Sequence, residues 1–107
     1  YVKLHLRGNI THLLPEIATL PLTVIDVDHM VDMATVRAHV GDNIVITGNI
    51  DPSSGVHDGT PAIIHSTIEN VYNTVGNPYM VNAGCEIPSG TPHDNLKALC
   101  ALRPYVT

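Results

Sequence analysis

The sequence predicts an α/β fold in which four parallel strands alternate with helices. Three observations predict it: four short apolar runs rich in β-branched residues, a helix-like stretch after each run, and no short hairpin between neighbouring runs. Parallel neighbours require a long, right-handed crossover, usually a helix. Four such units are half of an eight-stranded TIM (β/α)8 barrel, so we expect residues 1–107 to form a single half-barrel domain, a fragment of a larger barrel.

The predicted strands are the apolar runs themselves. They are Val2–Leu6, Thr23–Val27, Ile44–Thr47 and Tyr79–Asn82. The second run is almost continuously apolar, as is typical of a parallel strand that is buried on both faces. A half barrel leaves two unpaired sheet edges and uncovered inner side chains, so we expect it to need a second half or a partner copy.

Apolar residues at helical spacing predict a helix after each strand. Thr60, Pro61 and Gly76 give the third helix an N-cap, a first-turn proline and a left-handed stop. Thr91 and Pro92 repeat the cap and the proline for the last helix. The apolar stripes are Leu13, Leu14, Ile17 and Leu20 behind a Thr11 cap; Met33, Val36 and Val40 before Gly41; Ile64, Ile68, Val71 and Val75; and Leu96, Leu99 and Leu102.

Composition excludes several functional classes. The net charge is −5, and the basic residues are scattered, whereas nucleic-acid binding needs clustered Lys and Arg; they are Lys3, Arg7, Arg37, Lys97 and Arg103. No apolar run is long enough to span a bilayer, and no charged-then-apolar leader opens the sequence. Two cysteines, Cys85 in a polar turn and Cys100 on an apolar stripe expected in the core, indicate reduced thiols. We therefore expect a cytoplasmic protein.

Each predicted strand ends in a polar cluster. Parallel strands bring their carboxyl ends to one mouth, where ligands bind. Asp26 and Asp28 alternate along one strand, so they are either paired acid–base groups or helix caps, and Asn49 and Asp51 are either ligand contacts or turn residues. The clusters are His5, Arg7 and Asn9; Asp26, Asp28 and His29; Asn49 and Asp51; and Asn82, Cys85 and Glu86.

Three segments carry a family resemblance. His5–Asn9, Gly48–Pro52 and Asn82–Pro88 resemble the C-terminal half of the uroporphyrinogen decarboxylase superfamily, and most closely its corrinoid-linked methyltransferase branch, such as the methylcobalamin:coenzyme M methyltransferases. In that branch a His-x-Cys motif and a later Cys hold a zinc ion that activates the thiol receiving the methyl group. The resemblance implies His5 and Cys85 as metal ligands. Arg7 stands where the pattern has Cys.

The departure at Arg7 bears on the metal. A guanidinium in place of a thiolate removes a negative donor and adds a permanent positive charge, so zinc affinity should fall. Asp28 or Glu86 could replace the lost ligand, or Arg7 could bind a carboxylate or phosphate in a bidentate manner and convert the metal site into an anion site.

The strand ends indicate site roles, and the resemblance implies partners. From their strand-end positions we expect Asp28 and Glu86 to be catalytic residues, and Arg7, Asn49 and Asp51 to contact the substrate. The cofactors that the resemblance implies are zinc and a corrinoid methyl donor carried by a partner protein, and the substrate that it implies is a small thiol or a tetrapyrrole. The histidines without metal-ligand spacing are expected to be solvated or capping; they are His12, His39, His57, His65 and His93.

Three functions remain open on the sequence. The first is part of a zinc–thiol methyltransferase using a corrinoid. The second is a uroporphyrinogen decarboxylase-like enzyme that needs no metal, although the decarboxylase pattern has His where this sequence has Cys85. The third is a non-catalytic half barrel that self-associates as a homo-oligomer or pairs with a complementary half. We expect the fragment by itself to be inactive, because part of the substrate site lies on the other strands.

Overall fold

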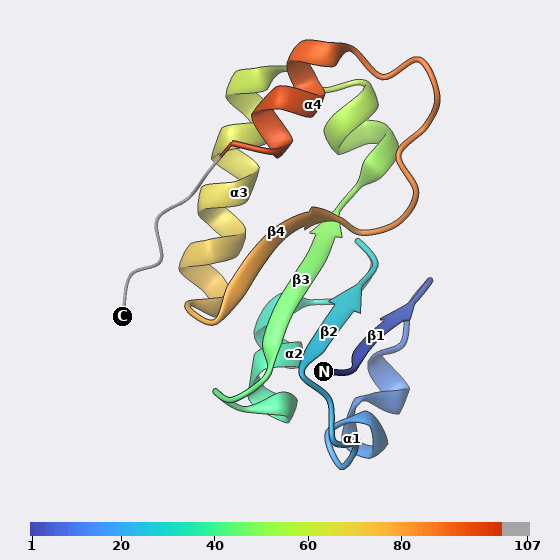
Figure 1. Ribbon diagram of the computed structural model, residues 1–107, viewed down its shortest axis with the longest axis vertical. Helices are drawn as coiled ribbons and strands as arrows, with labels where there is room; N and C mark the ends of the chain where they lie inside the picture. The colour runs from blue at the N-terminus through green and yellow to red at the C-terminus, as the bar shows by residue number, and fades with distance from the viewer. Residues whose placement is uncertain (102–107) are drawn as a thin grey trace.

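The computed structural model describes residues 1–101 and shows a single four-stranded sheet. The strands are β1 (Lys3–Leu6), β2 (Val24–Val27), β3 (Val45–Ile50) and β4 (Tyr79–Ala83), and they lie side by side in chain order (Figure 1). All three neighbouring pairs are parallel. The predicted α/β fold with four parallel β-α units is confirmed, and it is consistent with part of a TIM barrel.

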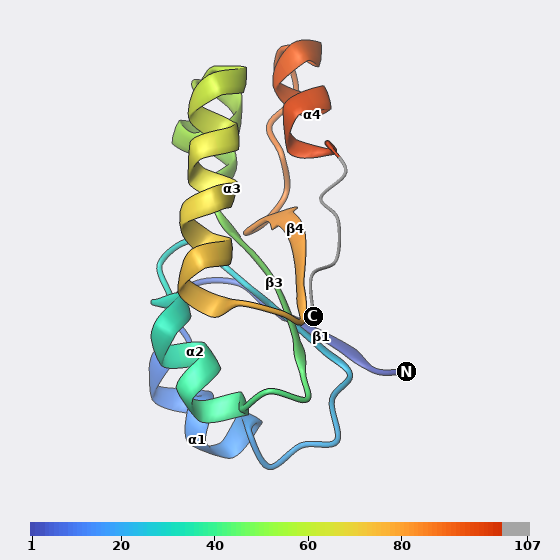
Figure 2. The same ribbon diagram turned by 90° about the vertical axis from the view of Figure 1, so that its left-hand side faces the viewer.

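The helices fill the crossovers between the strands. They are α1 (Leu14–Ile17), preceded by the 3-10 turn η1 (Thr11–Leu13), α2 (Met33–Val40), α3 (Pro61–Val75) and α4 (His93–Leu99). Figure 2 shows α1, α2 and α3 on one side of the sheet, and α4 packs against α3. Within residues 1–101 no helix has both the length and the apolar character to cross a bilayer.

The apolar core lies between the sheet and these helices. Ile25, Val27 and Ile46 of the central strands are at most 1% exposed and pack with Leu14 and Val36. A second cluster surrounds α3 and α4; it contains Ile50, Val56, Ile64, Ile68, Ala83, Ala98 and Leu99. Burying each of these aliphatic side chains fully, compared with leaving it in water, stabilises the fold by about 1.5–3 kcal/mol. The second cluster fixes the loops after β3 and β4, which carry much of the candidate site.

The opposite face of the sheet carries a row of polar side chains. His5, Asp26 and Thr47 lie side by side in the strand register and point away from the helices, because strand residues alternate between faces. Met80 continues this row and is 57% exposed. This open face is the one that would line the inside of a barrel.

Strand β3 runs three residues past its predicted end at Thr47. Gly48 and Asn49 both have positive φ, at 94° and 73°. A Cβ on Gly48 would clash with the Val27 carbonyl oxygen and lie 2.5 Å from Asp26 Oδ1, so only glycine allows this close approach of β3 to β2.

The caps of α3 follow the prediction, but two other predicted caps are wrong. Thr60 Oγ1 accepts a hydrogen bond from Ile63 N, and Gly76 ends α3 at φ 61°. The Thr11 N–H and hydroxyl donate to Asn9 Oδ1, so Asn9 makes that turn. The Thr91 hydroxyl donates to the Pro88 carbonyl oxygen and caps nothing.

Cys100 also differs from its prediction. We expect it in the core from its apolar stripe, but it is exposed because α4 ends one residue earlier, at Leu99. Leu102, the last residue of the same predicted stripe, lies outside the described residues.

At the amino ends of the strands, Arg37 of α2 joins several chain segments. Its Nε donates to the Val75 carbonyl oxygen at 3.0 Å, and its two Nη atoms donate to the carbonyl oxygens of Gly41, Ile44, Gly76 and Pro78 at 2.8–3.4 Å. Burial lowers the pKa of this guanidinium, and Asp42 opposes that effect. One side chain thus fixes the ends of α2 and α3 and the entries to β3 and β4.

Candidate active-site pocket

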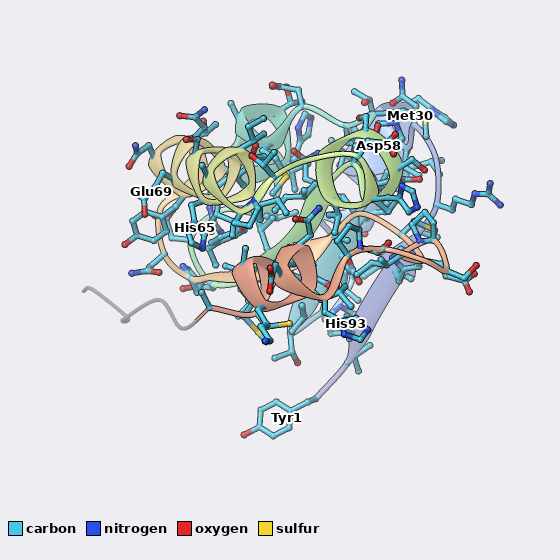
Figure 3. All side chains as sticks on the ribbon, turned by 90° about the horizontal axis from the view of Figure 1, so that it is seen from above. Tyr1, Met30, Asp58, His65, Glu69 and His93 are labelled. Atoms are coloured by element: carbon cyan, nitrogen blue, oxygen red, sulfur yellow. The ribbon has the colours of Figure 1, made fainter. Side chains whose placement is uncertain are left out.

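The carboxyl ends of the strands surround a pocket of about 470 Å³. Figure 3 looks down on this end of the molecule, with Met30 on the side of the helices and Tyr1 on the opposite side. All four polar clusters contribute residues to the pocket wall, as the parallel arrangement of the strands predicts. The pocket is lined by Arg7, Asp28, His29, Met30, Asp51, Pro52, Ser53, Cys85, Glu86, Ile87, Pro88 and Ser89.

Asp28 is the most buried polar residue of the pocket, at 3% exposed. β2 ends at Val27, so Asp28 is the first residue of the following loop, and its side chain lines the pocket. Its Oδ2 accepts from Gly8 N at 2.9 Å, and its Oδ1 accepts from His29 N at 2.8 Å. Burial raises the pKa of Asp28, but the hydrogen bonds from Gly8 and His29 outweigh it, so the pKa is lowered and the carboxylate is ionised at neutral pH.

His29 lies between two carboxylates. Its Nδ1 is hydrogen-bonded to Asp28 Oδ1 at 3.0 Å, and its Nε2 is 3.5 Å from Asp51 Oδ2. The backbone of Gly84 passes close by: a Cβ there would lie 2.8 Å from His29 N and 3.0 Å from Asp28 Oδ1. The turn that carries Cys85 is therefore packed directly against the Asp28–His29 pair.

Asp51 is mainly a capping residue. Its Oδ1 accepts from Ser53 N and Ser54 N at 2.9 and 3.2 Å, at the start of the π-helical turn η2 (Pro52–His57). Burial raises the pKa of Asp51. The hydrogen bonds from Ser54 and Ser53 and the interaction with His29 together outweigh burial, so the pKa of Asp51 lies below its ordinary value. Only its Oδ2 is turned toward His29.

Arg7, Cys85 and Glu86 line the pocket without any partner among the described residues. Arg7 and Glu86 are exposed, and Cys85 is half-buried. β1 ends at Leu6 and Gly8 has φ 83°, so Arg7 belongs to a turn that leaves the strand and reaches the mouth. The structure thus brings three residues of the first and fourth clusters together.

Asn49 lies behind the pocket. Its Nδ2 donates to the carbonyl oxygens of Asp28 and Val31 at 3.0 and 2.6 Å. It lines a separate hollow of about 410 Å³ beside α3. In this position Asn49 fixes the loop that carries Asp28 and His29.

His5 does not line the pocket that holds Cys85. It lies on the open face, where its Nδ1 is 3.3 Å from Asp26 Oδ2, and Lys3 Nζ is 3.4 Å from the same oxygen. Asn82 Nδ2 also reaches this oxygen, at 3.5 Å, while the buried Asp26 Oδ1 has no hydrogen-bond partner among the described residues. Asp26 therefore pairs with β1 and β4 side chains and not with Asp28.

The donors do not fit a zinc ion in this arrangement. No three His, Cys, Asp or Glu side chains of residues 1–101 are grouped so that they could hold a metal ion. His5 is engaged with Asp26, and Cys85 shares its pocket with the guanidinium of Arg7, which repels a cation. Arg7 places a permanent positive charge in the pocket beside Cys85.

Sequence reasoning did not assign a role to His29, which the structure places at the centre of the pocket wall. Its position directly after Asp28 was the available signal. Met30, Ser53 and the Ile87–Ser89 segment also line the pocket, and nothing in their residue types marks them.

Comparison with known proteins gives consistent results. A family model described as Uroporphyrinogen decarboxylase (URO-D) matches residues 1–104. The chain is 41% identical over 81 residues to uroporphyrinogen decarboxylase 2, chloroplastic, of Oryza sativa subsp. japonica, which covers 72% of this chain and 20% of that protein. It is 34% identical over 97 residues to the methylcobamide:CoM methyltransferase MtbA of Methanosarcina mazei, covering 90% of this chain and 27% of that protein.

A third relative gives a similar match. The uroporphyrinogen decarboxylase of Prochlorococcus marinus is 39% identical over 75 residues, which is 69% of this chain and 21% of that protein. The chain therefore spans between a fifth and about a quarter of the length of these relatives.

Proposed function

This chain belongs to the uroporphyrinogen decarboxylase family, and we propose that it forms the carboxylate-binding wall of an enzyme of that family, in which Arg7 binds an acidic group of a tetrapyrrole substrate without zinc. Four parallel units are half of an eight-stranded barrel, so four further units would complete the pocket. The name of the rice relative supports a tetrapyrrole as the substrate class.

The proposal rests on one observation: the carboxylates Asp28 and Asp51 already have hydrogen-bond partners, whereas Arg7 has none within residues 1–101. The oxygens of Asp28 and Asp51 accept hydrogen bonds from backbone N–H groups and contact His29. The Arg7 guanidinium has no acceptor among the described residues, so its five N–H donors are available to a ligand. A planar guanidinium binds a carboxylate through two parallel hydrogen bonds.

A titration with uroporphyrin, followed by fluorescence, tests this proposal. We expect Arg7→Gln to weaken binding about tenfold, which corresponds to about 1.4 kcal/mol, and Arg7→Lys to restore part of it. Lys97→Gln on the exposed side of α4 is the matched control, because it removes the same charge away from the pocket. Equal affinities for Arg7→Gln and Lys97→Gln would rule the proposal out.

Glu86→Gln gives a second readout of the same site. Glu86 is the remaining carboxylate of the pocket with no partner among residues 1–101. Removing its negative charge should strengthen porphyrin binding, because like charges repel at close range. Unchanged affinity would show that the bound carboxylates lie outside this pocket.

A second candidate is methyl transfer from a corrinoid, carried by a partner protein, to a thiol. It is favoured by the match to the methyltransferase, which covers 90% of this chain, and by Cys85 in the pocket. Zinc content of the purified chain discriminates the two candidates. Stoichiometric zinc in the unmodified protein would favour methyl transfer, whereas zinc only in Arg7→Cys would indicate a metal scaffold that this sequence has lost.

A further inference from the structure

The pair formed by Asp28 and His29 has the geometry of an acid–base dyad. In such dyads a buried carboxylate accepts from imidazole Nδ1–H and so fixes the tautomer and the orientation of the ring, which leaves Nε2 to exchange protons. Here Asp28 Oδ1 is 3.0 Å from His29 Nδ1, and Asp28 is 3% exposed.

Asp28 is itself held rigidly. Gly8 N and His29 N donate to its two oxygens, and Asn49 Nδ2 donates to its backbone carbonyl oxygen. The carboxylate therefore has a fixed direction before any ligand arrives. The His29 side chain is 38% exposed and lines the pocket.

We propose that His29, positioned by Asp28, is the residue that exchanges a proton with the substrate bound in this pocket. The inference rests on the proposed function, since it takes the substrate to be the carboxylate-bearing molecule bound by Arg7. In a decarboxylation the bond to the carboxylate carbon breaks, CO₂ leaves, and the electron pair stays on the substrate carbon. That carbon then takes the Nε2 proton of the doubly protonated His29 ring, which leaves a neutral ring with its proton on Nδ1, and a proton from the solvent restores Nε2–H.

The charges that face His29 come from every loop of the pocket. Asp28 contacts Nδ1, and Asp51 Oδ2 is 3.5 Å from Nε2. Arg7, Cys85 and Glu86 line the same space. The contact to Asp51 is long, whereas the contact to Asp28 is a hydrogen bond to a buried carboxylate that backbone N–H groups hold in place.

The chain contains a natural control pair. His57 Nδ1 is 2.6 Å from Asp58 Oδ1, and these residues are also adjacent in sequence, but Asp58 is 68% exposed and neither residue lines the pocket. A structural effect common to neighbouring His and Asp residues would appear equally at both pairs.

¹⁵N NMR of the imidazole rings tests the dyad. We expect neutral His29 to carry its proton on Nδ1, and Asp28→Asn to remove that preference, while Asp58→Asn alters His57 and leaves His29 unchanged. His29→Gln assigns the resonance. A His29 tautomer that does not respond to Asp28→Asn would overturn the inference whatever the ligand results are.

Ligand contact and turnover then separate this inference from the proposal for Arg7. Uroporphyrin should shift the His29 Nε2 resonance but not that of His57, and His29→Gln should leave its affinity within about threefold of wild type. In a barrel completed by four further units, with uroporphyrinogen as substrate, His29→Gln should lower kcat about 100-fold with little change in KM. Arg7-dependent binding without a His29 shift, or an unchanged kcat for His29→Gln in the completed barrel, overturns the role of His29 and leaves that of Arg7 intact. Binding that does not depend on Arg7 overturns the proposed function instead.

Discussion

Two arginines at opposite ends of one sheet serve different purposes. Arg37, at the amino ends of the strands, donates to five backbone carbonyl oxygens and is half-buried. Arg7, at the carboxyl ends, is exposed and donates to nothing within residues 1–101. In barrel folds the amino end of the sheet is the stabilising face and the carboxyl end is the reactive one. Arg7 is thus left available to a ligand at the end of the sheet where barrel folds bind their substrates.

The largest effect should come from Arg37→Ala. Removing this side chain leaves several carbonyl oxygens without their donor, and we expect the free energy of unfolding to fall by about 3–4 kcal/mol. Arg7→Ala, measured by the same urea denaturation, should change it by less than about 0.5 kcal/mol. Similar losses for the two variants would remove the distinction between the two ends.

Asn95→Ala tests a structural contact at the functional end. Asn95 is 3% exposed, and its Nδ2 donates to the carbonyl oxygens of Val56 and Gly59, which joins α4 to the η2 turn. We expect a loss of about 2 kcal/mol in thermal unfolding. The exposed Asn70→Ala on α3 is the control and should be nearly neutral. If Asn95→Ala were also neutral, the hydrogen bonds from Asn95 to Val56 and Gly59 would not stabilise this end of the molecule.

Asp51→Ala should have a smaller effect. It removes the cap of η2, a contribution of about 1 kcal/mol to stability, and it also removes the Oδ2 that faces His29. Asp51→Asn keeps an oxygen that can accept from Ser53 N and Ser54 N, so its melting temperature should stay closer to wild type. A melting temperature equal in all three proteins would show that the cap is not needed.

The smallest effect is a pH dependence confined to the functional end. The pKa of Asp28 is lower in the folded chain than in the unfolded one, so its contribution to stability is present above the unfolded value near 3.8 and is lost as the pH falls through the folded value. Denaturation from pH 7 to pH 3 should therefore show the gap between wild type and Asp28→Asn closing below about pH 4. A gap that stays constant to pH 3 would contradict this assignment.

The fold could be predicted because its signals are local and repeated. Thr60 and Gly76 bound α3 as expected, since each acts on its own helix end. Thr11 and Thr91 failed because their hydroxyls donate to nearer acceptors, Asn9 Oδ1 and the Pro88 carbonyl oxygen. A hydroxyl in a capping position has several possible partners, and the sequence does not state which one is closest.

The candidate site was predictable as a region, but not in its pairings. Parallel strands fix where polar ends meet, so Arg7, Asp28 and Cys85 share one pocket. Which carboxylate contacts which histidine depends on the point where each strand ends. Asp26 is still within β2 and faces the open side, whereas Asp28 is beyond it, so the two carboxylates separate and His29 acquires its partner.

The polar row on the open face of the sheet has a consequence for assembly. A second half barrel docking over Lys3, His5 and Asp26 would expel little water from apolar surface and would gain little hydrophobic free energy there. The outer strands β1 and β4 each have one side unpaired within residues 1–101, and their backbone N–H and C=O groups can extend the sheet. Strand pairing at β1 and β4 would then contribute more to joining this chain to further strands than would apolar contact with Lys3, His5 and Asp26.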